Sequence, residues 1–254
     1  MKKTQLEKDL AARLFFTKFY DHVADFRYAG RPNEIFDFCN SLPRMKPEVG
    51  NCKDKPTHDT VQFGPRQAYL DCVPDEFRVV SSGPIPGFLM PELEEIERRY
   101  RQPFNSIQIN RHYDQDSFVP PHHDAQQGHI AMMSLGAERP FILRHEKDDK
   151  AKTLNRYKAG DVLFDETLVH GSLLTLLPAR QFEVTHEMPK SEVPCGVRVS
   201  LIFRYICEEM TRKLYGRDVQ TANSKELRRE IARFREQNGL ETGPLAQPEG
   251  GMRQ

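Results

Sequence analysis

A histidine, a carboxylate and a distant second histidine stand in an order that could bind a metal ion. His122 and Asp124 are two residues apart, and His186 and Arg198 lie downstream. Two imidazoles and one carboxylate on one face of a metal leave open coordination positions, which is the ligand set of non-haem Fe(II) oxygenases. An arginine in the same pocket could hold a carboxylate co-substrate through two parallel hydrogen bonds. If these four side chains converge, they would form an oxygenase site of the 2-oxoglutarate type.

The choice among possible ligands follows from strand geometry. Side chains at i and i+2 share one face of a strand, so His122 and Asp124 could point at one metal while His123 points away. A turn-capping aspartate beside a surface histidine would give the same pattern. For the third ligand we favour His186, because it ends the extended run QFEVTH and leads into the strand of Arg198. The other histidines weighed for that place are His129, His145 and His170.

The segment VRVSLIFRYI predicts a strand that carries two arginines on one face. Alternation puts Arg198 and Arg204 on the same side and leaves the opposite side apolar. Two buried guanidinium groups need anionic partners, or each costs several kcal/mol. A bound dicarboxylate and Asp124 would supply those partners. The alternative is an exposed edge strand with both arginines in water.

Composition describes an ordinary globular chain that has no strong charge bias. The 254 residues are 38% hydrophobic and 29% charged, and Lys+Arg and Asp+Glu are equal at 37 each, so any nucleic-acid contact must come from a local basic patch. No apolar run approaches the ~20 residues that cross a bilayer, and the N-terminus does not resemble a secretory signal. The 5 cysteines never show Cys-x-x-Cys spacing, which favours reduced thiols in a cytoplasmic or nuclear setting.

Short β-rich runs dominate residues 104–206, and their spacing predicts a β-sandwich or barrel with flanking helices. Helical patterns are expected over residues 4–27, 33–40, 92–101, 208–216 and 224–237, with Gly239 ending the last, and extended pieces over 62–71 and 78–81. We therefore divide the chain into an N-terminal helical extension and linker (1–55), a catalytic domain with a substrate lid (56–206), C-terminal helices (207–240) and a disordered tail (241–254).

The segment 104–206 resembles the AlkB-like family of Fe(II)/2-oxoglutarate dioxygenases, in particular the branch that repairs alkylated nucleic acid. The matching pieces are FNSIQINRHY, HHD, SLGAERPFILRH, HGSLLTL, QFEVTHEMP and RVSLIFR. Upstream, FGPRQAYLD is similar to the start of the family's substrate-covering lid, so the resemblance extends over roughly residues 60–206. It implies a mainly β protein with flanking helices (α+β) and a double-stranded β-helix (jelly-roll) core.

The resemblance also implies roles for individual residues. The iron ligands would be His122, Asp124 and His186. Arg198 would bind the distal carboxylate of 2-oxoglutarate, Arg204 would lie at the iron end near Asp124, and Asn110 would hydrogen-bond the co-substrate. The family's tyrosine after that asparagine is displaced here, since His112 stands where it is expected and Tyr113 follows. Either a bulge re-aims Tyr113 or His112 takes its role.

The implied reaction is oxidative demethylation of N-alkylated bases in DNA or RNA, which consumes O2 and 2-oxoglutarate and releases formaldehyde, succinate and CO2. We expect a monomeric intracellular enzyme that does not bind membranes and whose partner is nucleic acid. Many family members have acidic residues after the ligand aspartate that help contact the base, but this chain has Ala125, Gln126 and Gln127. With no tryptophan, base stacking would need Phe63, Tyr69 or Phe77, or a histidine, and phosphates could meet Arg66, Lys53, Lys55 or the 225–237 helix.

Three other interpretations stay open. A 2-oxoglutarate oxygenase could act on a protein or a small molecule instead, which the neutral net charge and the missing acids favour. A β-barrel binding module could hold a structural or vestigial metal. A cupin with a different metal would use His123 as an additional ligand, and replacing His123 by alanine would then abolish metal binding.

Overall fold

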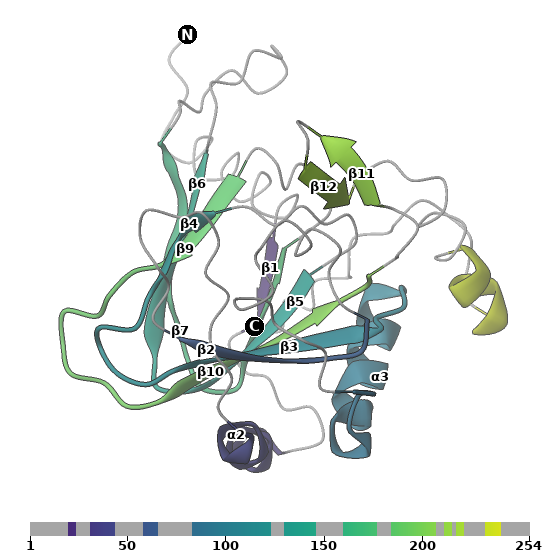
Figure 1. Cartoon of the computed structure of the whole chain (residues 1–254), viewed down its shortest axis with the longest axis horizontal. Helices are drawn as coiled ribbons and strands as arrows, with labels where there is room; N and C mark the ends of the chain where they lie inside the picture. Colours follow the sequence, from purple (N-terminus) through teal and green to yellow (C-terminus); the bar gives the residue numbers. More distant parts are fainter. Residues whose placement is uncertain are drawn as a thin grey trace, which may run out of the picture.

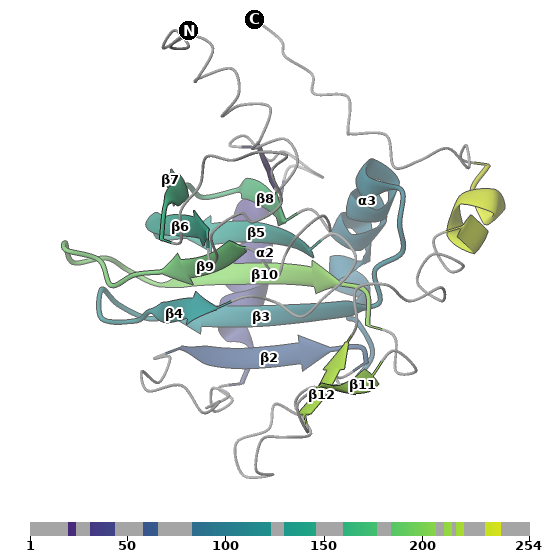
Figure 2. The same cartoon turned by 90° about the horizontal axis from the view of Figure 1, so that it is seen from above.

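The structure is a computed structural model dominated by antiparallel strands (Figures 1 and 2). It describes residues 20–23, 31–43, 58–65, 83–122, 130–145, 160–176, 184–206, 211–214, 217–220 and 232–239. Among these residues, no helix is long and apolar enough to cross a membrane.

Two antiparallel sheets form the body of the protein. The larger sheet has the order β1-β8-β5-β10-β3-β2, and the smaller has the order β4-β9-β6-β7. The strands of the larger sheet are β1 (Tyr20–Val23), β8 (Ser172–Leu176), β5 (Ile130–Gly136), β10 (Arg198–Arg204), β3 (Ser106–His112) and β2 (Asp59–Phe63). Those of the smaller sheet are β4 (Val119–His122), β9 (Val184–Met188), β6 (Arg139–His145) and β7 (Val162–Leu168).

The chain winds between the two sheets in the manner of a jelly roll. From β3 onward, the chain passes back and forth between the sheets. The strands β3, β5, β8 and β10 belong to the larger sheet, and β4, β6, β7 and β9 belong to the smaller one. Eight antiparallel strands wound in this way enclose one interior between two sheets. The predicted double-stranded β-helix core is therefore confirmed by the strand order itself.

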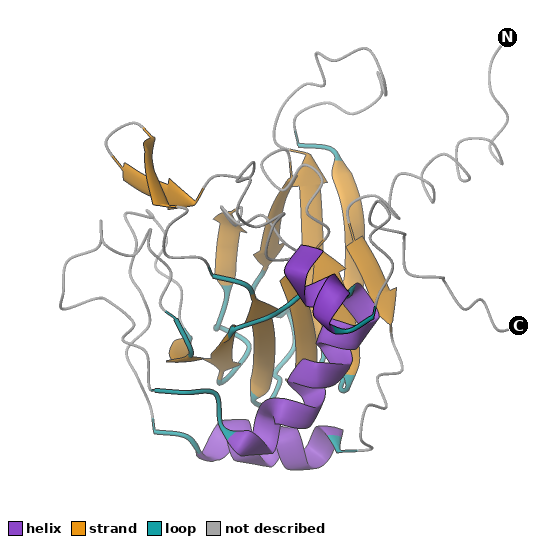
Figure 3. Ribbon diagram, turned by 90° about the vertical axis from the view of Figure 1, so that its right-hand side faces the viewer, coloured by secondary structure: helices purple, strands orange, loops and turns teal. Residues whose placement is uncertain are grey.

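Helices cover the outer face of the larger sheet (Figure 3). The helix α2 (Pro32–Ser41) and the helix α3 (Met90–Tyr100), which follows the short η4 (Gly87–Leu89), pack onto it. Each helix has proline in its first turn, where a missing N–H costs nothing. The core between helices and sheet contains Ile35, Cys39, Leu89, Leu93, Ile96, Ile107, Ile109, Leu135, Val199, Leu201 and Phe203.

The strand β10 shows how the alternation of one strand separates core from cavity. Its odd-numbered residues Val199, Leu201 and Phe203 enter the core under the helices, whereas Arg198 and Arg204 face the interior between the sheets. Because β10 lies between β5 and β3, it is central, and the exposed edge strand weighed as an alternative is wrong.

Most predicted elements are present, and two helix predictions are wrong. The helices expected at 33–40 and 92–101 are α2 and α3, and residues 232–237 are helical, followed by Gly239 at φ +65°. In contrast, β1 occupies part of the helix expected over 4–27, and strands β11 (Thr211–Leu214) and β12 (Arg217–Gln220) pair where 208–216 was expected to be helical. The rest of 4–27, the extended piece at 78–81 and the tail lie outside the described residues.

Gly136, at the end of β5, is closely packed against its neighbours beside β10, the strand of Arg198 and Arg204. It adopts φ +82° and pairs with Arg198 in the β5–β10 register. A Cβ at this position would overlap the backbone oxygen of Val197 and the ring of Phe36 from α2. Only glycine fits because both the backbone conformation and the space exclude a side chain.

We expect Gly136→Ala to lower the free energy of unfolding by roughly 2–4 kcal/mol, since overpacking adds to the positive-φ strain. Chemical denaturation followed by far-UV circular dichroism measures the change. Gly160→Ala is the matched control, because Gly160 has φ +91° and nothing within 4 Å of an added Cβ. Equal losses in the two variants would contradict the steric part of this explanation.

Candidate active site

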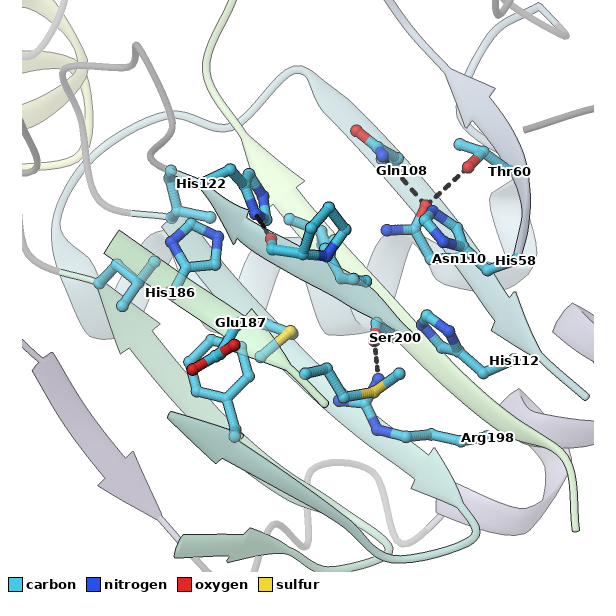
Figure 4. Close-up of a pocket in the computed structure, with 18 of the residues that line it drawn as sticks. His58, Thr60, Gln108, Asn110, His112, His122, His186, Glu187, Arg198 and Ser200 are labelled. Atoms are coloured by element: carbon cyan, nitrogen blue, oxygen red, sulfur yellow. Dashed lines mark hydrogen bonds between the residues drawn. The ribbon is translucent and has the colours of Figure 1, made fainter. Parts of the chain in front are cut away.

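A cavity of about 270 Å³ lies between the two sheets (Figure 4). Its apolar lining comes from both sheets and includes Ile130, Met132, Phe141, Leu176 and Ile202. Its polar lining is concentrated on β2, β3 and β10, and on the facing histidines of β4 and β9. The predicted site residues in its lining are Asn110, His122, His186, Arg198 and Arg204.

Two predicted metal ligands face each other at one end of the cavity. His122 on β4 pairs with His186 on β9, and their ring centroids are 4.1 Å apart. The ring of Phe141 stacks on His186 at 5.7 Å and restricts its orientation. Nδ1 of His122 lies 2.9 Å from the backbone oxygen of Pro120, a contact in which Nδ1 donates, so Nε2 keeps the lone pair that a metal requires.

The third predicted ligand, Asp124, lies outside the described residues, as does His123. Among the residues that the structure describes, no group of three or more His, Cys, Asp or Glu side chains is placed to hold a metal. The cavity contains His186 but neither His145 nor His170. The Nδ1 atom of His170 instead accepts a hydrogen bond of 2.8 Å from the backbone N–H of Gly136.

The guanidinium of Arg198 is buried in the cavity wall. It is 2% exposed and donates to the hydroxyls of Ser134, at 2.9 Å, and Ser200. Burial, together with the charge of Arg139, lowers the pKa of Arg198 to about 9. No carboxylate of the described residues pairs with it. A buried cation without a counter-ion is unfavourable, so this end of the cavity has the electrostatics of an anion site.

A hydrogen-bonded network connects Arg204 to Asn110. Arg204 Nη1 donates to Gln108 Oε1 at 2.6 Å. Asn110 Oδ1 accepts from Gln108 Nε2 at 3.0 Å and from Thr60 Oγ1 at 2.9 Å. Since both bonds end on the oxygen of Asn110, its side-chain NH2 group is left to donate into the cavity.

Tyr113 and His112 have different surroundings, and only His112 lines the cavity. The hydroxyl of Tyr113 donates to Asp59 Oδ2 at 2.6 Å. The same carboxylate forms a buried ion pair of 2.7 Å with Arg111. Tyr113 thus takes part in a structural cluster behind the cavity, and His112 is the side chain beside Arg198.

The structure adds His58, which the sequence motifs did not single out. Its ring lies 4.8 Å from that of His112, and both line the cavity. Burial lowers the pKa of His58 to about 4 and that of His112 well below its usual value. The alternation of HDTVQ, with His58, Thr60 and Gln62 on one face, is a signal that could have found it.

The residues predicted to meet the substrate are mostly outside the described part of the chain. These are Tyr69, Phe77, Arg66, Lys53 and Lys55. Phe63 is buried in the core under the helices and does not line the cavity.

Comparison with known proteins finds relatives that match part of the chain. No family model matches. A protein named DNA oxidative demethylase ALKBH2 from Arabidopsis thaliana is 32% identical over 120 residues, which are 41% of this chain and 38% of that protein. The proteins of that name from Mus musculus and Bos taurus are 33% and 32% identical over 126 residues, covering 46% of this chain and 51% and 44% of theirs.

The matched segment is similar to part of these AlkB-type demethylases. The chain spans about half the length, or less, of the curated relatives that it matches. Among solved structures, OsALKBH1 is 14% identical with a TM-score of 0.49, over 73% of this chain and 97% of that one. An oxidoreductase of the 2OG-Fe(II) oxygenase family from Burkholderia pseudomallei is 17% identical with a TM-score of 0.48, over 77% and 88%.

We expect the candidate site to lose most of its affinity for divalent cobalt, by about 100-fold or more, when His122 or His186 is replaced by alanine. The visible spectrum of Co(II) in an anaerobic titration measures binding. His170→Ala is the matched control, because His170 is engaged with Gly136 outside the cavity. His123→Ala should bind as the wild type does. Loss of binding in His123→Ala would instead support the cupin alternative.

The buried His58 should make stability sensitive to acid. Its imidazole takes a proton near pH 6.5 in the unfolded chain but only near pH 4 in the folded one. The unfolded state therefore binds more protons between these values, and the free energy of unfolding falls as the pH is lowered through that window. His58 contributes up to about 3 kcal/mol of this loss.

Denaturation of the metal-free protein between pH 4 and 7 measures this effect. His58→Gln should have a shallower pH dependence than the wild type, because glutamine does not titrate. A variant curve parallel to the wild-type curve would show that His58 is not buried in its neutral form.

Proposed function

We propose that the protein is an Fe(II)/2-oxoglutarate-dependent dioxygenase that removes methyl groups from ring nitrogens of bases in DNA or RNA. The observation that carries the proposal is that the two ends of the cavity differ in chemistry. One end has the facing imidazoles of His122 and His186, and the other has the buried cation of Arg198, with which no carboxylate of the described residues pairs. A ligand that chelates a metal at one end and presents a carboxylate at the other matches both ends.

The donor set suits ferrous iron. His122, His186 and Asp124 would hold it, as two neutral imidazoles and one carboxylate that leave positions open for other ligands. The bond of His122 to the Pro120 carbonyl selects the tautomer that can bind a metal. When bound, the iron supplies the activation of O2 that couples decarboxylation of 2-oxoglutarate to oxidation of the methyl group, with formaldehyde, succinate and CO2 as products.

The side chains of the larger sheet would position the keto acid. Arg198, fixed by two serine hydroxyls, would bind its distal carboxylate. Asn110 would donate its side-chain NH2 group, and Gln108 orients that group through Oδ1. The apolar lining from both sheets would exclude water around the reacting groups.

Nucleic acid is the substrate class that the relatives' names favour, since each is named a DNA oxidative demethylase. A base inside a duplex could not reach a cavity between two sheets, so the target would be flipped out or single-stranded. We propose that the enzyme acts as an intracellular monomer, in the cytoplasm or nucleus. The second candidate, a protein or small-molecule substrate, is favoured by the uncharged run Ala125, Gln126 and Gln127 after Asp124.

The test is succinate formation from 2-oxoglutarate with a panel of methylated single- and double-stranded DNA and RNA oligonucleotides, and with peptides as the comparison. We expect turnover coupled to formaldehyde release with methylated oligonucleotides and none with Asp124→Ala. Arg198→Gln should raise the KM for 2-oxoglutarate by about 10-fold or more, since a charge-assisted bond contributes ≈ 1.5–3 kcal/mol. Turnover with peptides alone would overturn the nucleic-acid assignment, and no 2-oxoglutarate turnover would overturn the enzyme class.

A further inference from the structure

Two histidines close the cavity beside Arg198. His112 stands opposite Arg198 in the pairing of β3 with β10, and β2 continues the sheet beyond β3. Because Asp59 pairs with Arg111, His58 is next to His112 across the two strands. Arg198 on β10, His112 on β3 and His58, which directly precedes β2, therefore form one row on the cavity side (Figure 4).

This row contains polar atoms that the described residues leave unused. Nδ1 of His58, Nδ1 of His112 and Nε of Arg198 are buried and have no hydrogen-bond partner in the described part of the chain. The two imidazoles are 9% and 1% exposed, so bulk water does not compensate for the missing bonds. Buried polar groups are nearly always satisfied, and three such atoms in the wall of one cavity indicate a polar ligand.

We propose that His58 and His112 bind the same carboxylate as Arg198 by hydrogen bonds from their ring nitrogens. This inference rests on the keto-acid site proposed above. The anion subsite of this chain then consists of one guanidinium and two imidazoles, and Tyr113 has no part in it. His58 belongs to it because β2, which His58 directly precedes, lies beside β3.

The hydrogen bonding of His58 gives this arrangement a measurable consequence. A bond to the backbone of Phe118 favours the protonated ring, so a ring N–H donates there. A neutral imidazole carries one ring proton, which leaves Nδ1 of neutral His58 as a lone pair that repels a carboxylate. The histidine pair must therefore take up a proton when the anion binds.

The charged groups around the pair agree with this direction. Arg198 on β10 and Arg139 on β6 disfavour a proton on the pair, as does His122 on β4, whereas Asp59 on β2 favours one. A carboxylate bound at Arg198 would offset the two arginines. Affinity for the anion should consequently increase as the pH falls from 8 to 6.5.

The experiment is calorimetric titration of N-oxalylglycine, the amide analogue of 2-oxoglutarate, into the full-length Mn(II)-loaded protein. Comparing two buffers with different ionisation enthalpies gives the number of protons taken up. We expect uptake by the wild type and weaker binding, by about 10-fold, in His112→Phe, which lacks ring nitrogens. His58→Gln can still donate to Phe118 but lacks Nδ1, and it should lose both affinity and proton uptake.

Two further variants separate ligand contact from a structural role. His112→Tyr offers a hydroxyl donor that does not titrate near neutral pH, so it should bind within about 3-fold of the wild type at pH 8 with a flatter pH dependence. His170→Gln, outside the cavity, should match the wild type. If the wild type binds without proton uptake and the cavity variants bind equally well, the histidine assignment is overturned and the proposed function is untouched. If the wild type does not bind at all, the proposed keto-acid site itself is wrong.

Discussion

The burial of the Arg198 guanidinium is the constraint on which the arrangement of the cavity depends. A cation with 2% exposure on the central strand of a sheet has to be compensated locally. Two serine hydroxyls from β5 and β10 orient it but do not neutralise it. Gly136, opposite Arg198 in the register, keeps the backbones of β5, α2 and the segment before β10 close together. The site is thus arranged for an anion before any ligand binds.

The two-sheet architecture explains why the metal ligands and the anion site come from different strands. His122 and His186 pair within the smaller sheet, whereas the polar rows of β2, β3 and β10 belong to the larger one. A molecule bound between the sheets would contact both sets at once. The same alternation that directs Arg198 inward directs Val199 and Leu201 into the helix-covered core, so the anion site and the hydrophobic core stabilise the same strand from opposite faces.

Strand alternation made the inward face of β10 predictable, and the position of His186 at the end of an extended run before the Arg198 strand favoured it as the partner of His122. The helices α2 and α3 could also be predicted from the sequence, because proline and apolar spacing mark them locally. The wrong predictions involve pairings that the local pattern does not contain. The strand β1 exists because β8 lies beside it, although 4–27 has helical spacing. The strands β11 and β12 are separated only by Tyr215 and Gly216, whereas the local sequence around them was read as helical.

The difference between Tyr113 and His112 illustrates how one residue of register changes a site. Adjacent residues of a strand face opposite sides. His112 ends β3 on the cavity side, and the hydroxyl of Tyr113 binds Asp59, whose carboxylate also neutralises the buried Arg111. Moving Tyr113 into the cavity would remove one of the donors to that carboxylate and bring a second large ring beside His58. The register therefore places the imidazole of His112, and not the phenol of Tyr113, in the cavity wall. An imidazole, unlike a phenol, can change its charge near neutral pH when an anion approaches.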